Sequence, residues 1–126
     1  MSITKVTSDV LEARYTDAAV ISGTSGTISV DWSAAAVYKM NASLTGATTL
    51  NFTGFVKGQV LTIHQLQGAQ TVTLTSDAGN SSTFYKIGAD YDGSSDPNIL
   101  QVECLDDSVN ALFAFTTATI ATSTTI

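Results

Sequence analysis

The stretch from Thr45 to Ser76 is the feature that most constrains what this chain can fold into. Apolar and polar residues alternate through it, threonine is abundant, and four glycines interrupt the pattern. Period-two alternation places successive side chains on opposite faces of a strand, one buried and the other in water. Short strands separated by glycine turns about every ten residues are typical of an antiparallel sandwich or barrel. The stretch therefore predicts an all-β domain.

The alternation continues through most of the chain beyond Ala19. Ile28, Val30 and Trp32 share one face, and Leu61 and Ile63 face away from His64 and its alternating neighbours. The remaining apolar segments include Ile99–Leu105 and Ala111–Thr116, which read as a closing hairpin. We expect about eight strands in an antiparallel, jelly-roll-like β-sandwich that spans residues 20–126. The sequence shows no convincing internal repeat.

Residues 1–19 differ in composition from the rest. Asp9–Tyr15 (DVLEARY) is the one segment with helical composition, and Ser8 or Asp9 is a suitable N-cap. A helix of under three turns is marginal by itself. We therefore interpret residues 1–19 as an arm or short helix that packs on a neighbour or on the sandwich edge, with Val10, Leu11 and Tyr15 as its candidate interface residues.

Composition and charge limit the classes of partner. Charged residues make up 13% of the 126 residues, and the net charge is −6, whereas an ordinary domain has about 25% charged residues. The five basic residues are scattered, which argues against nucleic acid and against anionic membranes, because phosphate contacts need a clustered basic patch. No segment resembles a signal peptide or a membrane span. Serine and threonine supply the polar surface, so long-range repulsion between copies is weak.

The reactive side chains do not form a recognisable catalytic pattern. His64 is the single histidine and Cys104 the single cysteine, and no GxSxG motif is present. Cys104 lies in an apolar strand and reads as a small buried hydrophobic residue, which fits synthesis in a reducing cytoplasm. Asp106 and Asp107 are adjacent in a turn and should point apart, which does not suit a glycosidase pair. We expect a protein that is not an enzyme.

The loop Asp90–Asp96 (DYDGSSD) is the one cluster with the composition of a metal site. Its carboxylates at Asp90, Asp92 and Asp96 are hard oxygen ligands of the kind that Ca²⁺ takes. The spacing differs from the helical calcium loop, since glycine falls at the fourth position and no glutamate at the twelfth. An exposed acidic turn is the simpler interpretation. No cofactor is expected, and Ca²⁺ remains the weaker alternative.

Aromatic residues offer a second kind of site, because flat rings stack on sugar faces. Trp32 and Tyr38 lie on inward strand faces and are expected in the core. Tyr85 and Tyr91 lie near loops and are the better candidates for ligand contact.

Several segments resemble a β-sandwich module of bacteriophage virion proteins, found in tail-fibre regions and in small head proteins that decorate capsids. The matching pieces are Ile28–Ser33, Gly46–Phe52, Lys57–Ile63, Gly68–Thr73 and the hairpin from Val102 to Phe115. The resemblance covers roughly residues 26–116. The chain departs from it after Thr73, where a Trp/Pro pair is common, and at Asp106–Ser108, where an aromatic-ending turn is common.

The resemblance implies a structural protein of the virion that forms homotrimers. The sandwich fills the chain from about residue 20 and leaves no long shaft, which favours a capsid decoration protein over a fibre segment. We expect it to bind the major capsid protein outside the shell after synthesis in the host bacterial cytoplasm. The alternative is a tail-fibre module that recognises host-surface glycans through Tyr85 and Tyr91.

Overall fold

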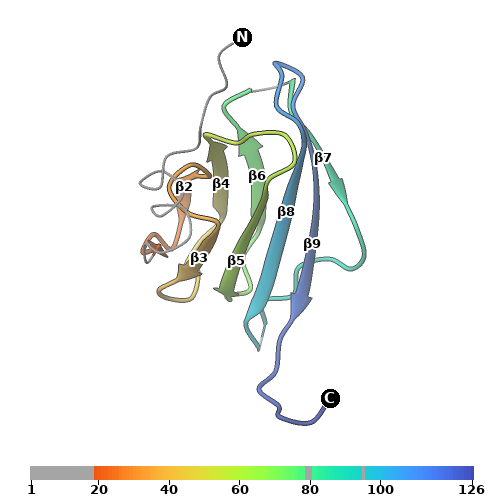
Figure 1. The fold of residues 1–126 in the computed structure, drawn as a ribbon. Coiled ribbons are helices and arrows are strands. Elements are labelled where there is room, and N and C mark those ends of the chain that lie inside the picture. The colour runs from red at the N-terminus through yellow and green to blue at the C-terminus, as the bar shows by residue number, and fades with distance from the viewer. Residues whose placement is uncertain (1–18, 79–80, 95) are drawn as a thin grey trace.

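A computed structural model describes residues 19–78, 81–94 and 96–126 and folds them into two facing β-sheets (Figure 1). One sheet has six strands in the order β1-β3-β5-β8-β9-β7, and the other has three in the order β2-β4-β6. The strands are β1 (Val20–Ile21), β2 (Gly26–Asp31), β3 (Val37–Met40), β4 (Thr48–Thr53), β5 (Val60–Leu66), β6 (Val72–Ser76), β7 (Thr83–Lys86), β8 (Asn98–Asp106) and β9 (Leu112–Thr119). The predicted all-β class with two sheets is confirmed.

The first six strands wind as successive coils, because the chain changes sheet at every step from β1 to β6. Strands that stack within a sheet are parallel. Val20 pairs with Lys39, 19 residues further on, and Thr48 pairs with Val72, 24 residues further on. We call residues 20–76 the coil region. Each coil adds one strand to each sheet, so the chain has a structural repeat that its sequence does not show plainly.

The predicted antiparallel pairing is wrong for most of the molecule. Five of the seven strand ladders are parallel, and only the β5–β8 and β8–β9 ladders are antiparallel. A jelly roll is antiparallel throughout, so this topology is not one. Alternation determines which side chains are buried, but it says nothing about the direction of the neighbouring strand. The described residues form nine strands where about eight were expected, and the expected helix at Asp9–Tyr15 lies outside them.

The core fills the space between the two sheets and follows the predicted alternation. Trp32, Phe52 and Phe113 are wholly buried, and their rings meet at centroid distances of 5.5–6.0 Å. Phe55 completes this cluster with an edge contact to Phe113 at 4.9 Å. Aromatic pairs in such geometries add about 0.5–1.5 kcal/mol beyond their buried area. Trp32 and Phe52 come from the coils and Phe113 from β9, so the cluster joins both parts of the molecule.

The last three strands extend the six-stranded sheet beyond the coils. β8 pairs with β5 and forms the predicted hairpin with β9, and β7 runs parallel to β9 at the sheet edge. We call residues 83–119 the hairpin region. The register shifts between Ile63 and Leu66, where Gln65 has a φ of 61°. A bulge of this kind interrupts a ladder and bends the strand. Here it lies in the antiparallel β5–β8 ladder, on the opposite side of β5 from its parallel neighbour β3.

Candidate functional site: a groove and an exposed sheet face

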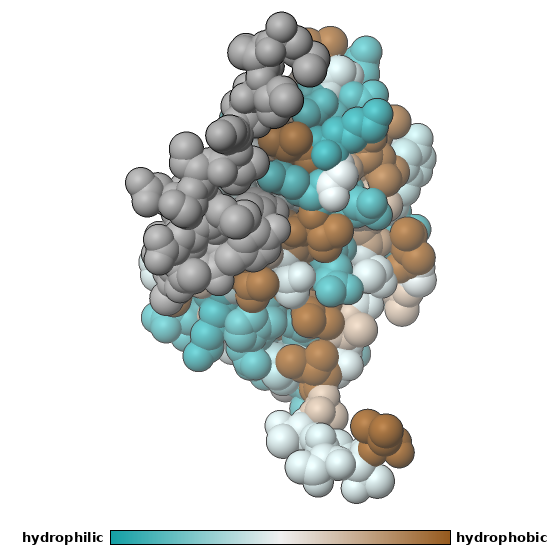
Figure 2. All heavy atoms as spheres, in the orientation of Figure 1, coloured by the Kyte–Doolittle hydropathy of each residue, from teal (hydrophilic) through white to brown (hydrophobic). Residues whose placement is uncertain are grey.

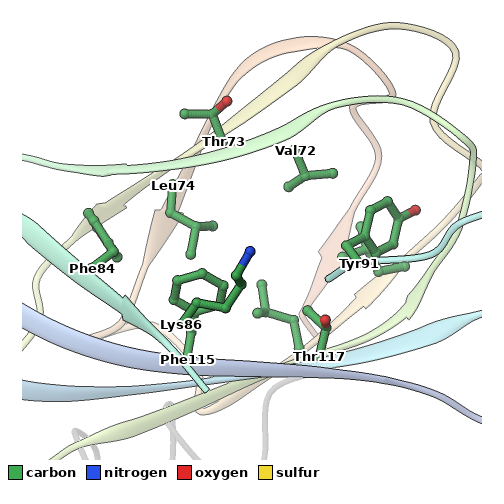
Figure 3. A pocket seen from close by; sticks show the side chains of 10 residues that line it. Val72, Thr73, Leu74, Phe84, Lys86, Tyr91, Phe115 and Thr117 are labelled. Atoms are coloured by element: carbon green, nitrogen blue, oxygen red, sulfur yellow. The ribbon is translucent and has the colours of Figure 1, made fainter. Parts of the chain in front are cut away.

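The two sheets differ in width, and this difference opens a groove at one side of the molecule. The three-stranded sheet ends at β6, whereas the six-stranded sheet continues to β9 and β7. The groove between them has a volume of about 370 Å³. It is lined by Leu66, Val72, Thr73, Leu74, Phe84, Lys86, Tyr91, Leu100, Phe115 and Thr117. Figure 3 shows Val72 and Leu74 of β6 pointing toward β7 and β9, with Tyr91 at one end and Phe84 at the other.

Most of the groove lining is apolar, and its one cation is paired. Val72, Leu74, Phe84 and Phe115 are half-buried and pack on the core from one side while facing the groove on the other. The Lys86 ammonium group forms an ion pair with the Asp90 carboxylate. Hydrogen bonding and charge attraction from Lys86 hold the pKa of Asp90 below its ordinary value of 3.8. The groove therefore suits an uncharged, partly apolar occupant.

Tyr91 belongs to the scaffold of the groove as well as to its wall. Its hydroxyl donates to the carbonyl of Gly68 at 2.8 Å, and the Gly68 amide donates to the carbonyl of Gly93 at 3.0 Å. A Cβ on Gly93 would lie 2.1 Å from that Gly68 carbonyl oxygen. Burial, followed by the nearby Asp92 carboxylate, raises the pKa of Tyr91. These contacts fix Tyr91 and Gly93 against the turn between β5 and β6.

Two of the three candidate calcium ligands, the carboxylates of Asp90 and Asp92, are engaged separately. Asp90 pairs with Lys86, and Asp92 accepts hydrogen bonds from the Ser94 amide at 3.0 Å and from its hydroxyl at 2.6 Å. The backbone carbonyl of Asp96 accepts from the Asn98 side chain at 3.3 Å. Nowhere in the described residues do three carboxylate, histidine or cysteine side chains gather as a metal site would require. Asp92 instead closes a local turn, which lowers its pKa.

Tyr85 and Tyr91 lie on different surfaces. Tyr85 is 51% exposed and sits between Phe84 and Lys86, which line the groove. Successive side chains of a strand point to opposite faces, so Tyr85 belongs to the solvent face of the six-stranded sheet. The structure thus does not bring the two candidate ligand residues into one platform.

The solvent face of the six-stranded sheet, which we call the outer face, carries little charge and several exposed apolar side chains. In register across four strands lie Val60, Glu103, Ala114 and Tyr85. Among the described strand residues of this face, the charged side chains are those of Lys39, Glu103 and, past the register shift at the end of β8, Asp106. The exposed large apolar residues on or beside it are Val20, Val37, Val60, Tyr85 and Ile87, each 46–59% exposed. Figure 2 shows apolar residues interspersed with polar ones on the side in view.

His64 and Cys104 lie on opposite sides of the six-stranded sheet. His64 is half-buried on the outer face, where it pairs in register with Lys39. Cys104 is buried on the inner face, which confirms the prediction of a core cysteine. Burial, and then the Asp107 carboxylate, raises the pKa of the Cys104 thiol. The two side chains are not placed to act together.

The predicted interface residues Val10, Leu11 and Tyr15 lie outside the described residues. Sequence reasoning missed the groove, although its apolar residues were recognised as strand residues. Alternation marks Leu74 or Phe115 as inward-facing, but the signal is the same whether the opposite sheet covers the residue or ends beside it. Strand order, which the sequence did not reveal, makes that difference.

The part of the chain that the structure describes contains no helix with the length and hydropathy of a membrane span. Comparison with known proteins found no matching family, no matching curated protein and no matching solved structure.

Proposed function

We propose that this protein is a structural component of a bacteriophage virion, a homotrimeric decoration protein that binds the major capsid protein outside the shell and stabilises it. The resemblance of residues 26–116 to phage virion modules supports the assignment to structural virion proteins. The outer face of the six-stranded sheet is the observation that carries an adhesive role. Under this proposal the protein is made in the host cytoplasm and resides in the virion.

The outer face has the properties of a surface that is buried in an assembly. Val37 and Val60 are 53% and 46% exposed although they lie in regular strands, and burying apolar area stabilises association by about 25 cal/mol per Å². The face carries few charges, and those of Lys39 and Glu103 have opposite signs, so copies of the face do not repel each other strongly. Exposed apolar patches on a polar surface commonly mark protein contacts.

Charged substitutions on the two sheets test this role. Val37→Glu/Val60→Glu adds two charges to the outer face, and Thr27→Glu/Ser29→Glu adds the same charges to exposed positions of β2 on the other sheet. We expect light scattering to show trimers for the wild type and the β2 variant and monomers for the outer-face variant. Only the first two proteins should sediment with shells of the phage that encodes the chain. Trimers and shell binding in the outer-face variant would refute the role of this face.

The arm provides a separate test of capsid docking. β1 begins at Val20, so deletion of residues 1–19 leaves every described strand intact. We expect the truncated protein to keep its strand-dominated circular dichroism and to lose shell binding. Undiminished binding by a folded truncated protein would show that docking uses another surface.

Glycan recognition is the second candidate, and half-exposed Tyr85 is the observation that favours it. Tyr85→Ala is a cleaner probe than Tyr91→Ala, because the Tyr91 hydroxyl also holds its own segment of the chain to Gly68. Saturable binding on a glycan array that is lost in Tyr85→Ala would favour a receptor-binding module over a decoration protein.

A further inference from the structure

We propose that residues 120–126 of one copy, which we call the tail, dock as an added strand beside β6 of a second copy and fill its groove. This contact deepens the proposed self-association, on which it rests. It uses the groove and the tail, whereas the trimer test above uses the outer face.

The receiving edge belongs to β6. Within the described residues, β6 pairs with β4 on one side and has no strand on the other. An open edge presents backbone donors and acceptors that readily pair with another chain. Beside this edge lies the groove, with Leu74, Phe84 and Phe115 on its walls. An added strand would therefore find backbone partners along β6 and apolar pockets for alternate side chains, as in recognition by strand addition.

The tail is uncharged and partly apolar, as an occupant of this groove should be. Its sequence, IATSTTI, carries no charged side chain and is rich in β-branched residues that prefer extended backbone. As a strand it would place Ile120, Thr122, Thr124 and Ile126 on one face. Residues 121–126 are exposed, including the apolar side chain of Ile126. Figures 1 and 2 show the C-terminal end of the chain standing away from the sheets. An uncharged strand also leaves the Lys86–Asp90 pair undisturbed.

The direction of the tail points to a second copy. The Ile120 amide donates to the carbonyl of Pro97 at 2.9 Å, which ties the start of the tail to the residue just before β8 begins. From there the chain continues away from the sheets (Figure 1), and six extended residues reach about 20 Å. To enter the groove of its own copy the tail would have to reverse direction after Ile120. When each copy gives a tail and receives one, the contact is head-to-tail, and such contacts form a closed ring, such as a trimer, when the rotation between copies closes.

Cross-linking between two full-length variants tests the contact. Thr124→Cys places a thiol on the tail, Lys86→Cys places one on the groove wall, and the native Cys104 is buried. We expect a mixture of these proteins to form a disulfide-linked dimer several-fold faster than a mixture of Thr124→Cys with Thr27→Cys, whose thiol lies on exposed β2. Equal rates in the two mixtures would overturn the proposal.

Two further measurements separate the alternatives. The double variant Lys86→Cys/Thr124→Cys at high dilution should not form a disulfide within one chain. Rapid formation would show that the tail enters the groove of its own copy, and it would overturn the proposal that a second copy supplies the tail. Adding Ile126→Asp to the tail should slow cross-linking several-fold, whereas Thr125→Asp, on the opposite face of the strand, should leave it unchanged. Both positions are exposed, so neither change should affect folding. If tail contact fails while the outer-face variant still loses its trimers, the proposed function stands and this inference falls.

Discussion

The coil region and the hairpin region solve the same problem of strand pairing in different ways. In the coil region every strand finds a parallel partner one coil away, as Val37 does with Thr62, 25 residues further on. In the hairpin region β8 and β9 pair antiparallel across a turn of five residues, 107–111. Parallel coils can be extended by further coils, whereas the hairpin is followed in its sheet by β7 alone. The comparison shows which of the two sheets has an open edge beside its last coil strand.

The hairpin region completes only one of the two sheets. β8 covers β5, the last coil strand of the six-stranded sheet, whereas β6, the last coil strand of the other sheet, has only β4 beside it in the described residues. The groove exists because of this inequality. A binding surface thus arises here from topology, with no reactive side chain at its centre.

The largest effect should come from removing the side chain that joins the two regions. Phe113 of β9 is wholly buried and contacts the rings of Trp32, Phe52, Phe55 and Phe84. Phe113→Ala should lower the free energy of unfolding by about 3–5 kcal/mol, measured by urea denaturation. Both regions share this cluster, so we expect Trp32 fluorescence and far-ultraviolet circular dichroism to report one coincident transition.

Phe84→Ala is the matched control for that measurement. Phe84 stacks on Phe113 at 4.8 Å but is only half-buried beside the groove, so its loss should cost less. Two separate transitions in Phe113→Ala, with fluorescence unchanged while strand content falls, would show that the hairpin region detaches from intact coils.

A smaller effect should come from crowding one coil against the next. Gly68 has a φ of 113°, and a Cβ there would lie 2.7 Å from the backbone oxygen of Leu44 in the preceding coil. Gly58 also has a positive φ, 89°, but a Cβ there would meet nothing within 4 Å. Gly58→Ala should cost about 1–2 kcal/mol for backbone strain alone. Gly68→Ala should cost about 1–3 kcal/mol more, because backbone atoms must move.

Thermal unfolding of these two glycine variants measures the spacing of the coils. Equal losses of stability would mean that the coils separate easily at Leu44, and that the stacking of parallel strands is looser than in the structure.

Local patterns predicted the faces of the strands well and their partners poorly. Trp32, Leu61, Ile63 and Cys104 are buried as expected, because burial depends on a period that a few neighbouring residues reveal. The hairpin was also predicted, since its two strands adjoin one turn. The parallel ladders join residues 19–29 positions apart, and no local signal specifies such a partner. The groove depends on strand order and was missed for the same reason.

The smallest effect concerns acid, and it compares two turns of the hairpin region, one beside the groove and one between β8 and β9. Hydrogen bonds from Ser108 lower the pKa of Asp106 at the hairpin turn, and those from Ser94 lower the pKa of Asp92 beside the groove. A lowered pKa in the folded state means that the ionised form stabilises the fold. That contribution is present above the ordinary value of 3.8 and disappears as the pH falls through the folded-state pKa.

We therefore expect the melting temperature to stay level from pH 7 to about 5 and to fall gently at lower pH. Asp106→Asn and Asp92→Asn keep an oxygen that accepts the turn hydrogen bond but cannot titrate in this range, so each should flatten part of the acid decline. Both carboxylates are exposed, and solvent screening keeps their effects small. An acid decline of unchanged steepness in both variants would place the sensitive groups elsewhere in the chain. A decline flattened only by Asp106→Asn would instead show that the hairpin turn, rather than the groove loop, is where acid first loosens the fold.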